Sequence, residues 1–347
     1  MGIMPDYFFK ATGIGSVPWV NAYDACRKIN HLLPDIPFWP QLVKLNPLEY
    51  MIAQFTEGLP LVEVNTNTGA VTLSSDNREK ALSEFYSHYH ADDLEYFSIG
   101  PGYAEGLYSM IEFVKENPGK GEYIKGHITG PVTFAAGFKD KDGRSALFYP
   151  DLLKTYAKGL AIKALWQVRA LEKTGKRPII FLDEPYLSCL GSDLLPIGRH
   201  EIAGILKEVI DYLKQRSEAI IGIHCCGSTE WPMIMDSGVD IINLDAYSFQ
   251  ESLFPYPDHL KRFISKGGAI AWGIVPTGDF AGRADIYELY ERLVSGLSRL
   301  ISLGLTKELV YAASILTPAC GMGTMTEKGS DDVISLLSML SKRMRGK

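Results

Sequence analysis

The sequence has little of what marks several classes of protein. Its 347 residues include five cysteines, an odd and sparse set that excludes a disulfide framework. No apolar run reaches the roughly 20 residues that a membrane-spanning helix needs. Residues 1–11 have neither the basic start nor the long apolar stretch of a signal peptide. These absences predict a cytoplasmic protein that does not cross a membrane.

Positive charge is also scarce. The chain has 35 Lys and Arg against 41 Asp and Glu, which gives a formal net charge of −6. We find no basic stripe of the kind that binds phosphate backbones, so we expect no nucleic-acid partner. The hydrophobic fraction of 46% and the charged fraction of 22% are those of ordinary globular proteins. A mainly disordered, collagen-like or coiled-coil protein is therefore excluded.

What the sequence does have is a repeated alternation of short apolar runs with amphipathic stretches. Because buried strands that alternate with helices form parallel sheets, this pattern predicts an α/β fold, a (β/α)8 TIM barrel that forms a single domain over 1–347. The expected strands are 11–18, 61–67, 123–130, 178–185, 219–226, 240–247, 268–276 and 309–319, and the expected helices include 151–174, 202–215, 286–303 and 331–344.

Two segments near the start of the chain need separate interpretation. The run 61–67 has an alternative to a barrel strand, since residues 66–75 could instead form a hairpin. The segment 34–60 is long, aromatic and rich in proline. We interpret it as an insertion after the first strand that caps the mouth of the barrel.

A histidine and two cysteines stand at the ends of predicted strands. His224 and Cys226 share a face of the fifth strand and Cys225 points to the other, because alternate residues of a strand face the same way. Cys320 ends the eighth strand, and the strands of a barrel open onto one mouth. Zinc accepts imidazole and thiolate ligands, and Asp245 at the end of the sixth strand could add a carboxylate oxygen. The pattern predicts one catalytic zinc ion.

Each of these residues also has a purely structural interpretation. A lone buried cysteine is usually a small hydrophobic residue, and a lone histidine on a strand is usually part of a hydrogen-bonded core. Their joint placement at the predicted catalytic face favours a metal. Zinc deprotonates a bound thiol, and the thiolate is the nucleophilic form. A site with two cysteinates suits the activation of a substrate thiol better than of water, so alkyl transfer to sulfur is the predicted chemistry.

Six short motifs occur in a fixed order along nearly the whole chain. Together they resemble the C-terminal catalytic barrel of cobalamin-independent methionine synthase and, more broadly, the superfamily shared with uroporphyrinogen decarboxylase and the methylcobamide:coenzyme M methyltransferases. The motifs are IGSVP (14–18), ITGPVTF (128–134), LDEP (182–185), HCCG (224–227), DIINLD (240–245) and TPACGMG (317–323).

The resemblance implies a ligand set for the metal. The family binds zinc through His, Cys, Glu and Cys, which places the ion on His224, Cys226 and Cys320. The fourth position falls on Asp245, whose side chain is one methylene shorter than the glutamate of the family. The implied activity is the transfer of a methyl group to the thiolate of homocysteine to form methionine.

The resemblance also implies how the amino-acid end of homocysteine is held. Ile14 and Ser16 would bind its carboxylate, and Asp183 would bind its ammonium group and count among the catalytic residues. Glu57 or Glu63 would be a second partner of the ammonium group. A zwitterion needs donors at one end and a buried carboxylate at the other, which agrees with this assignment.

Three departures from the family bear on the methyl donor. The chain lacks the duplicate N-terminal barrel of the family, Gly137 stands near the position of the tryptophan that stacks on the pterin, and 273–278 contains no histidine after the seventh strand. A methyl–cobalt donor needs no proton on its leaving group, whereas a tetrahydrofolate amine does. The departures therefore predict a single-barrel methionine synthase that is fed by a methylcorrinoid protein. The aromatic residues Phe38, Trp39 and Tyr50 of the cap are candidates for its docking surface.

Several alternatives remain open. The thiol could be a different one, such as coenzyme M, or the donor could be the folate after all. The chain could also be an enzyme similar to uroporphyrinogen decarboxylase, or a corrinoid- or zinc-binding protein without catalytic activity. His127, which faces inward on the third expected strand, could contact the substrate or belong to the core.

Overall fold

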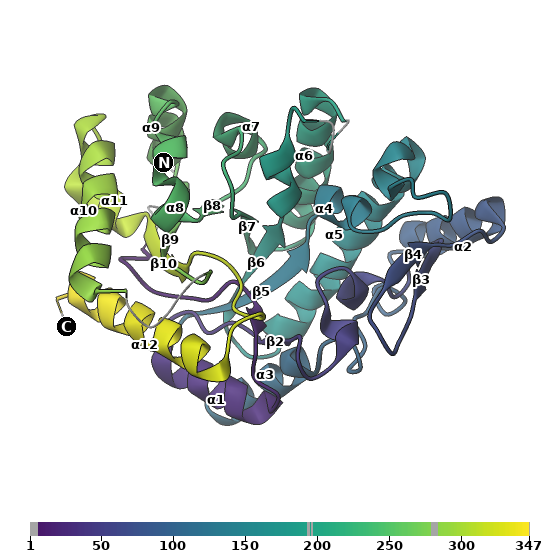
Figure 1. Cartoon of the computed structure of the whole chain (residues 1–347), viewed down its shortest axis with the longest axis horizontal. Coiled ribbons are helices and arrows are strands. Elements are labelled where there is room, and N and C mark those ends of the chain that lie inside the picture. Colours follow the sequence, from purple (N-terminus) through teal and green to yellow (C-terminus); the bar gives the residue numbers. More distant parts are fainter. Residues whose placement is uncertain (1–5, 193–194, 196, 279–283, 347) are drawn as a thin grey trace.

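Six parallel strands, adjacent to one another in chain order, form one curled sheet at the centre of the protein (Figure 1). The computed structural model describes residues 6–192, 195, 197–278 and 284–346. The strands are β5 (Tyr123–Thr129), β6 (Arg177–Asp183), β7 (Ile220–Cys225), β8 (Ile241–Leu244), β9 (Ala269–Val275) and β10 (Ser314–Pro318). The six strands confirm the parallel α/β architecture expected from the alternating pattern.

Short irregular segments run along both edges of this sheet. Ala11 pairs with Leu316 of β10, and Phe38 pairs with Lys125 of β5. Between them, the two-residue strands β1 (Ser16–Val17) and β2 (Gln41–Leu42) pair in parallel. Backbone contacts therefore connect the two edge strands of the sheet through residues 11–17 and 38–42. The second of these segments lies within 34–60, which the sequence suggested as a cap.

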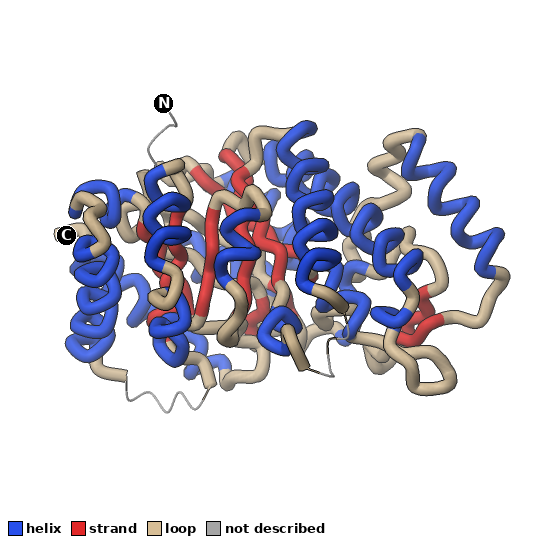
Figure 2. Tube along the Cα trace, turned by 90° about the horizontal axis from the view of Figure 1, so that it is seen from above, coloured by secondary structure: helices blue, strands red, loops and turns tan. Residues whose placement is uncertain are grey.

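The expected strand 61–67 is not part of the curled sheet. The strands β3 (Val62–Val64) and β4 (Val71–Leu73) instead pair antiparallel as a separate hairpin at one end of the molecule (Figure 2). The polar turn explains this outcome, because the side chain of Asn65 accepts hydrogen bonds from the backbone of Asn67 and Thr68, and Gly69 has a φ of +68°. The hairpin alternative for this region is thus the one observed.

Helices cover the outer face of the curled sheet (Figures 1 and 2). The four helices expected from periodicity are confirmed within a few residues as α5 (Pro150–Glu172), α6 (Arg199–Arg216), α10 (Ile286–Ser302) and α12 (Glu327–Met344). The others are α1 (Ala22–Leu32), α2 (Arg78–His90), α3 (Glu105–Glu116), α4 (Pro131–Ala136), α7 (Trp231–Asp236), α8 (Ala246–Phe249), α9 (Pro257–Ser265) and α11 (Lys307–Ala312), with 3-10 turns η1 (Pro47–Glu49), η2 (Ala53–Phe55), η3 (Ala146–Phe148), η4 (Pro185–Cys189) and η5 (Gln250–Leu253). The expected strand 309–319 therefore begins too early, since α11 occupies its first residues.

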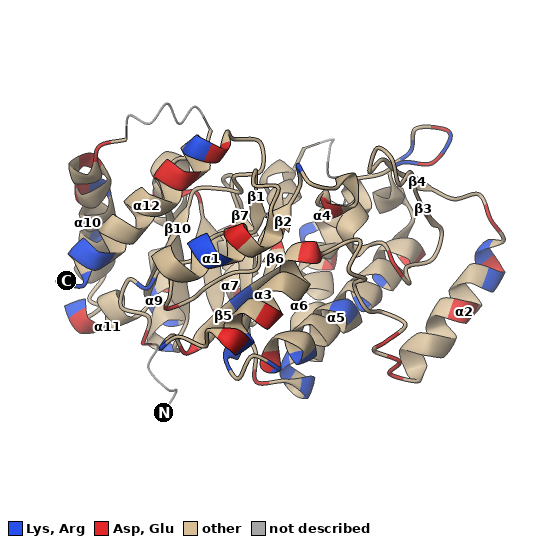
Figure 3. Ribbon diagram, turned by 90° about the horizontal axis from the view of Figure 1, so that it is seen from below, with Lys and Arg blue, Asp and Glu red and all other residues tan. Residues whose placement is uncertain are grey.

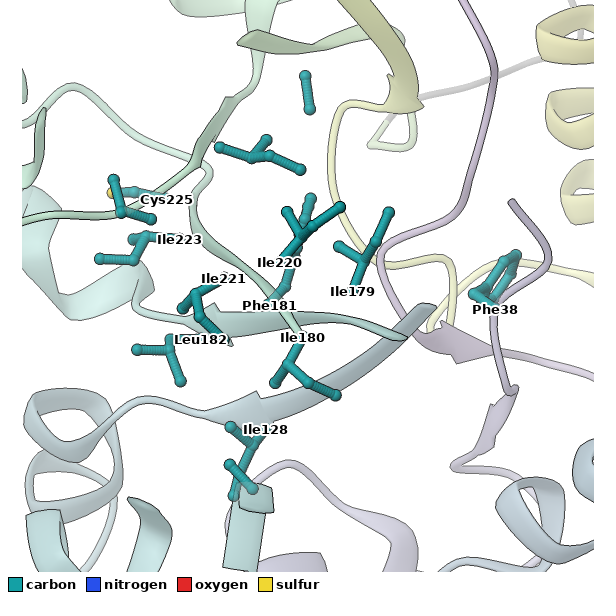
Figure 4. Close-up of a cluster of buried hydrophobic side chains, with 14 of the residues drawn as sticks. Phe38, Ile128, Ile179, Ile180, Phe181, Leu182, Ile220, Ile221, Ile223 and Cys225 are labelled. Carbon is teal, nitrogen blue, oxygen red and sulfur yellow. The ribbon is translucent and has the colours of Figure 1, made fainter. Parts of the chain in front are cut away.

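The core between sheet and helices follows from the alternation of residues along the strands. In Figure 4, Ile221, Ile223 and Cys225 of β7 point to the same side, and all three are fully buried. The intervening Gly222 and His224 must therefore face the concave side of the sheet. Charged residues of both signs are interspersed on the surrounding helices (Figure 3). No helix in the described part of the chain is long and apolar enough to cross a membrane.

Candidate functional site

His224, Cys226 and Cys320 converge at the carboxyl ends of β7 and β10. Their potential ligand atoms all lie within 4.8 Å of one another. His224 is buried and both cysteines are partly buried. Tetrahedral zinc with bonds of about 2.0–2.3 Å would place its ligand atoms about 3.3–3.8 Å apart, so the group fits such an ion without large movement. The sequence-predicted histidine and cysteines are thus brought together.

Asn243 fixes the proton of the His224 ring. The side-chain amide of Asn243 donates to the carbonyl of Ala271 at 2.8 Å and to Oγ1 of Thr317 at 2.9 Å, so its oxygen faces His224. This oxygen lies 2.6 Å from Nδ1 of His224, which must therefore carry the hydrogen. Nε2 is left with a free lone pair, and it is buried without a hydrogen-bond partner. A metal ion could be the partner of this lone pair.

Sequence reasoning missed Asn243, although a signal was present. Asn243 is aligned with His224 in the register of β7 and β8 and shares its inward face. A polar residue inside an otherwise apolar strand, beside a predicted ligand, is the expected signature of a group that orients that ligand.

The loop that carries Cys320 is fastened to Ser16. The backbone N–H of Met322 donates to the carbonyl of Ser16 at 2.9 Å, and that of Gly323 donates to its hydroxyl at 3.3 Å. A Cβ atom on Gly321 would lie 2.2 Å from the same hydroxyl oxygen. Two of the six motifs, IGSVP and TPACGMG, therefore form one structural unit in which glycine is needed for close approach.

The two thiols of the group differ in acidity. The hydrogen-bonding interaction with Cys320 lowers the pKa of Cys226, against the opposing effect of burial. The same interaction, together with burial, raises the pKa of Cys320. Cys225 is on the other face of the strand, where burial raises the pKa of its thiol to about 12. The contact between the two thiols therefore favours a thiolate on Cys226.

A pocket of about 710 Å³ opens beside this group. Asp183 lies on its wall with Oδ1 buried and without a hydrogen-bond partner. Burial raises the pKa of Asp183 to about 6, and the nearby His224 and Lys125 partly offset that effect. The predicted substrate residues Ile14, Ser16 and Asp183 share this pocket with the three metal candidates, and its other lining residues are Gln41, Val43, Lys44, Tyr50, Met51, Pro185, Gly321, Gly323 and Thr324.

Two predicted site residues belong neither to the candidate metal group nor to the residues that line the pocket. Asp245 is the N-cap of α8, where its carboxylate accepts a 2.8 Å hydrogen bond from the backbone of Ser248, and it is not a member of the candidate metal group of His224, Cys226 and Cys320. Glu57 is not among the residues that line the pocket, and its carboxylate accepts a 2.6 Å hydrogen bond from the backbone of Gly100. Its alternative, Glu63, accepts from the hydroxyl of Ser74 in the β3–β4 hairpin.

The expected docking aromatics are only partly available at the surface. Phe38 and Trp39 are fully buried, and Trp39 stacks on His127 with 3.9 Å between ring centroids. Tyr50 alone of the three is exposed, and it lines the pocket. The backbone pairing of Phe38 with β5 explains why these rings face the interior rather than a partner protein.

Glu184 connects two further motifs. Its fully buried carboxylate accepts hydrogen bonds from the backbone of Val132, and from both the backbone and the hydroxyl of Thr133, at 2.6–3.0 Å. Burial raises the pKa of Glu184 to about 7, and these hydrogen bonds oppose the rise. The LDEP and ITGPVTF motifs are therefore held together by the residue that follows Asp183.

Neither a scan against models of protein families nor a comparison with curated proteins finds a match for the sequence. Among solved structures, the chain is similar in fold to a methionine synthase. That structure is a B12-independent methionine synthase from Shewanella sp. W3-18-1 in complex with selenomethionine, with a TM-score of 0.59, 15% identity, and coverage of 97% of this chain and 98% of that chain. At this identity the similarity shows the fold. A GH138 enzyme that targets pectin rhamnogalacturonan II aligns with a TM-score of 0.30 and 9% identity over 96% of this chain and 50% of that chain, which is too low to support an argument.

Proposed function

We propose that the protein is a zinc-dependent methyltransferase that transfers a methyl group to the thiolate of homocysteine and so forms methionine. The observation that carries this proposal is the pocket in which an unpartnered carboxylate, Asp183, lies beside His224, Cys226 and Cys320. The methionine synthase that shares the fold is in complex with selenomethionine, an analogue of the proposed product. The likeness in fold and the chemistry of the pocket thus support the same reaction.

The donor set fits zinc. His224 offers a free lone pair, and Cys226 and Cys320 offer thiolates, which leaves the fourth position of a tetrahedral site for the substrate. A bound zinc ion would supply the charge that lowers the pKa of the substrate thiol. Asp245 is a further proposed ligand, through Oδ2, which the substrate thiol would displace, since only its Oδ1 accepts the hydrogen bond that caps α8.

The remaining residues would bind the amino-acid end of homocysteine. The carboxylate of Asp183 would accept hydrogen bonds from the substrate ammonium group, and the segment of Ile14 and Ser16 would provide donors for its carboxylate. In the reaction, the thiol proton leaves to solvent, a sulfur–carbon bond forms, and the bond between the methyl group and the donor breaks. The chain's own residues therefore position the thiol and hold the charges at its far end.

We further infer that a methylated corrinoid, carried by a protein, is the donor. The support lies in the sequence, where Gly137 stands near the position of the pterin-stacking tryptophan and 273–278 contains no histidine. Polyglutamyl methyltetrahydrofolate is the competing donor, and coenzyme M is the competing thiol. The donor would approach over Tyr50 and Lys44, which are exposed and line the pocket.

We also infer that the curled sheet and the two edge segments form one closed (β/α)8 barrel, with 34–60 serving in part as a cap. The pairings of Ala11 with β10, of β1 with β2, and of Phe38 with β5 support closure. The single-domain assignment over 1–347 and the cytoplasmic location remain predictions, and residues 1–5 and 347 lie outside the described residues.

The test is the formation of methionine by zinc-loaded protein. Homocysteine is supplied with methylcobalamin or with methyltetrahydrofolate in separate reactions, and coenzyme M replaces homocysteine in a third. Methionine from methylcobalamin supports the whole proposal, while methionine from the folate overturns the donor alone. Methylation of coenzyme M but not of homocysteine overturns the substrate. Cys320→Ala is the inactive control and Cys225→Ala, on the opposite face of the strand, is the control that keeps activity.

A further inference from the structure

The inward face of β5 carries three polar residues, two of which donate hydrogen bonds to segments that line the pocket. Lys125, His127 and Thr129 alternate along the strand and share one side of it. The ammonium of Lys125 donates to the carbonyl of Ile14, and the hydroxyl of Thr129 donates to the carbonyl of Met51. Both acceptors belong to residues that line the pocket. One strand thus fixes the backbone of two segments on which the proposed substrate would lie.

Lys125 is an unusual residue for this position. Its side chain is fully buried, with Nζ 4.4 Å from the centre of the Phe181 ring. Removal of an ammonium group from water is costly, and an apolar side chain would pack here without that cost. The residue receives electrostatic compensation from Asp183 and one hydrogen-bond acceptor from Ile14. The retained charge therefore acts on those two groups, one at each end of the proposed binding site for the amino acid.

The hydrogen bond to Ile14 also sets the direction of the next N–H group. The described chain has no cis peptide bond, so the carbonyl of Ile14 and the N–H of Gly15 point to opposite sides of their peptide plane. The carbonyl of Ile14 points toward Lys125, so the N–H of Gly15 points away from Lys125. Gly15 packs closely against the His127 ring of β5, since a Cβ atom built there would lie 2.7 Å from that ring.

We propose that Lys125 is a positioning residue for carboxylate recognition: it holds the Ile14–Gly15 peptide so that the N–H of Gly15 faces the pocket and receives the carboxylate of the substrate. The choice of homocysteine as that substrate rests on the proposed function. The N–H of Gly15 would bind the carboxylate. The buried ammonium group of Lys125 would orient that N–H without touching the substrate.

The test compares ligands with and without a carboxylate. In the wild type and in Lys125→Met, kcat and KM are measured for homocysteine and for 3-aminopropane-1-thiol, which lacks the carboxylate. We expect the preference for homocysteine, as the ratio of kcat/KM values, to fall at least tenfold through KM, while bound zinc stays unchanged; an effect through Asp183 acts on the ammonium group of both thiols and cancels in this ratio. An unchanged ratio, or an equal loss for both thiols, overturns the proposal.

The matched control is Lys163→Met. Lys163 is also fully buried and donates to backbone carbonyls, those of Phe97 and Ser98 at 3.0 Å, but it does not line the pocket. It is expected to lose stability and to keep the ratio. If Lys125→Met does not fold, Lys125→Gln, which keeps an N–H donor without the charge, takes its place and is expected to retain part of the preference.

A binding measurement separates this proposal from the proposed function. Stabilisation of zinc-loaded protein against heat is measured with methionine and with 3-(methylthio)propylamine, its analogue without the carboxylate. Lys125→Met should lose much more of the methionine effect than of the amine effect, even if no donor supports turnover, because both ligands share the ammonium group beside Asp183. Equal stabilisation by both ligands in the wild type would overturn the role of Lys125, whereas absence of methyl transfer to any thiol would overturn only the reaction.

Discussion

Asn243 holds His224 in a single tautomer from the neighbouring strand, with 2.6 Å between the amide oxygen and Nδ1. Asn243→Leu removes this acceptor while it keeps a similar volume. Without this acceptor the His224 ring can rotate and can exchange its proton between Nδ1 and Nε2, so Nε2 presents its lone pair to the metal less often. Zinc affinity should therefore fall roughly 10–100-fold. Competition with a chromophoric chelator measures the change. Thr317→Val, which removes only a partner of the Asn243 amide, should have a smaller effect, and unaltered affinity in Asn243→Leu would show that the tautomer does not matter.

Substitution of the three cysteines near the site should distinguish metal ligands from a residue that only packs in the core. Cys226→Ala and Cys320→Ala should each lose most bound zinc and nearly all activity, because two protein ligands do not hold the ion tightly. Cys225→Ala should keep both, since Cys225 faces the helices, as the alternation in Figure 4 shows, and its loss costs only stability. Metal content by elemental analysis decides the matter. Equal zinc loss in all three variants would contradict the assignment.

Ser16 and Gly321 should show strong coupling. Gly321→Ala places a Cβ atom 2.2 Å from the Ser16 hydroxyl oxygen and should destabilise the loop of Cys320 by about 1–3 kcal/mol. Ser16→Ala removes that oxygen, and the nearest remaining atom, its Cβ, lies 3.6 Å away. The double variant should therefore be more stable than the sum of the single changes predicts. Urea denaturation of the four proteins measures the coupling energy, and additive effects would refute the contact.

Glu184 should matter for folding rather than for turnover. Glu184→Ala leaves buried donors of Val132 and Thr133 without an acceptor, which should cost roughly 1–3 kcal/mol in the free energy of unfolding. Glu184→Gln keeps one acceptor oxygen and should cost less. The measurement is chemical denaturation together with the KM for homocysteine. A large rise in KM with unchanged stability would point to a direct role at the substrate.

Stability should rise with pH because of Lys163. Burial lowers the pKa of Lys163 in the folded protein to about 7, although the negative charge of Glu57 opposes this shift. In the unfolded chain the pKa of Lys163 is about 10.4. Between these values the unfolded chain binds more protons, so the contribution of Lys163 to the free energy of unfolding grows with pH, by at most about 1.4 kcal/mol per pH unit.

The matched comparison is with Lys163→Met, which lacks this titration. Urea denaturation of both proteins from about pH 7 to about pH 9 should show the wild type gaining stability relative to the variant as the pH rises. A difference that does not change with pH would indicate that Lys163 keeps its proton in the folded protein.

The sequence predicts four of the helices from local periodicity, and it predicts the group of His224, Cys226 and Cys320 from their places at the ends of expected strands. The apolar rhythm of α5 and α6 and the His224–Cys226 spacing are short-range features. Residues 38–42 belong to the segment 34–60, whose proline and aromatic content predicts a cap. Their pairing with β1 and β5 involves so few residues that no periodicity develops to mark a strand. Asp245 was considered as a ligand, although an aspartate directly before a helix is equally typical of an N-cap.

The buried lysines and Asn243 escaped prediction for a different reason. Their partners are backbone carbonyls and side chains distant in sequence, such as Ile14 for Lys125 and Thr317 for Asn243. No local pattern marks a polar residue that is satisfied by a remote acceptor. Knowledge of the strand register was needed to place them.

The hydrogen bond from Gly323 to Ser16 joins residues 307 positions apart in the chain. During synthesis, the segment around Ser16 leaves the ribosome long before the loop that packs on it. The sheet can assemble strand by strand, but the pocket has no complete wall until nearly the whole chain has emerged. Chains that stop before β10 would therefore leave the edge of β9 unpaired, and their pocket would lack the wall that Cys320, Gly321 and Gly323 provide.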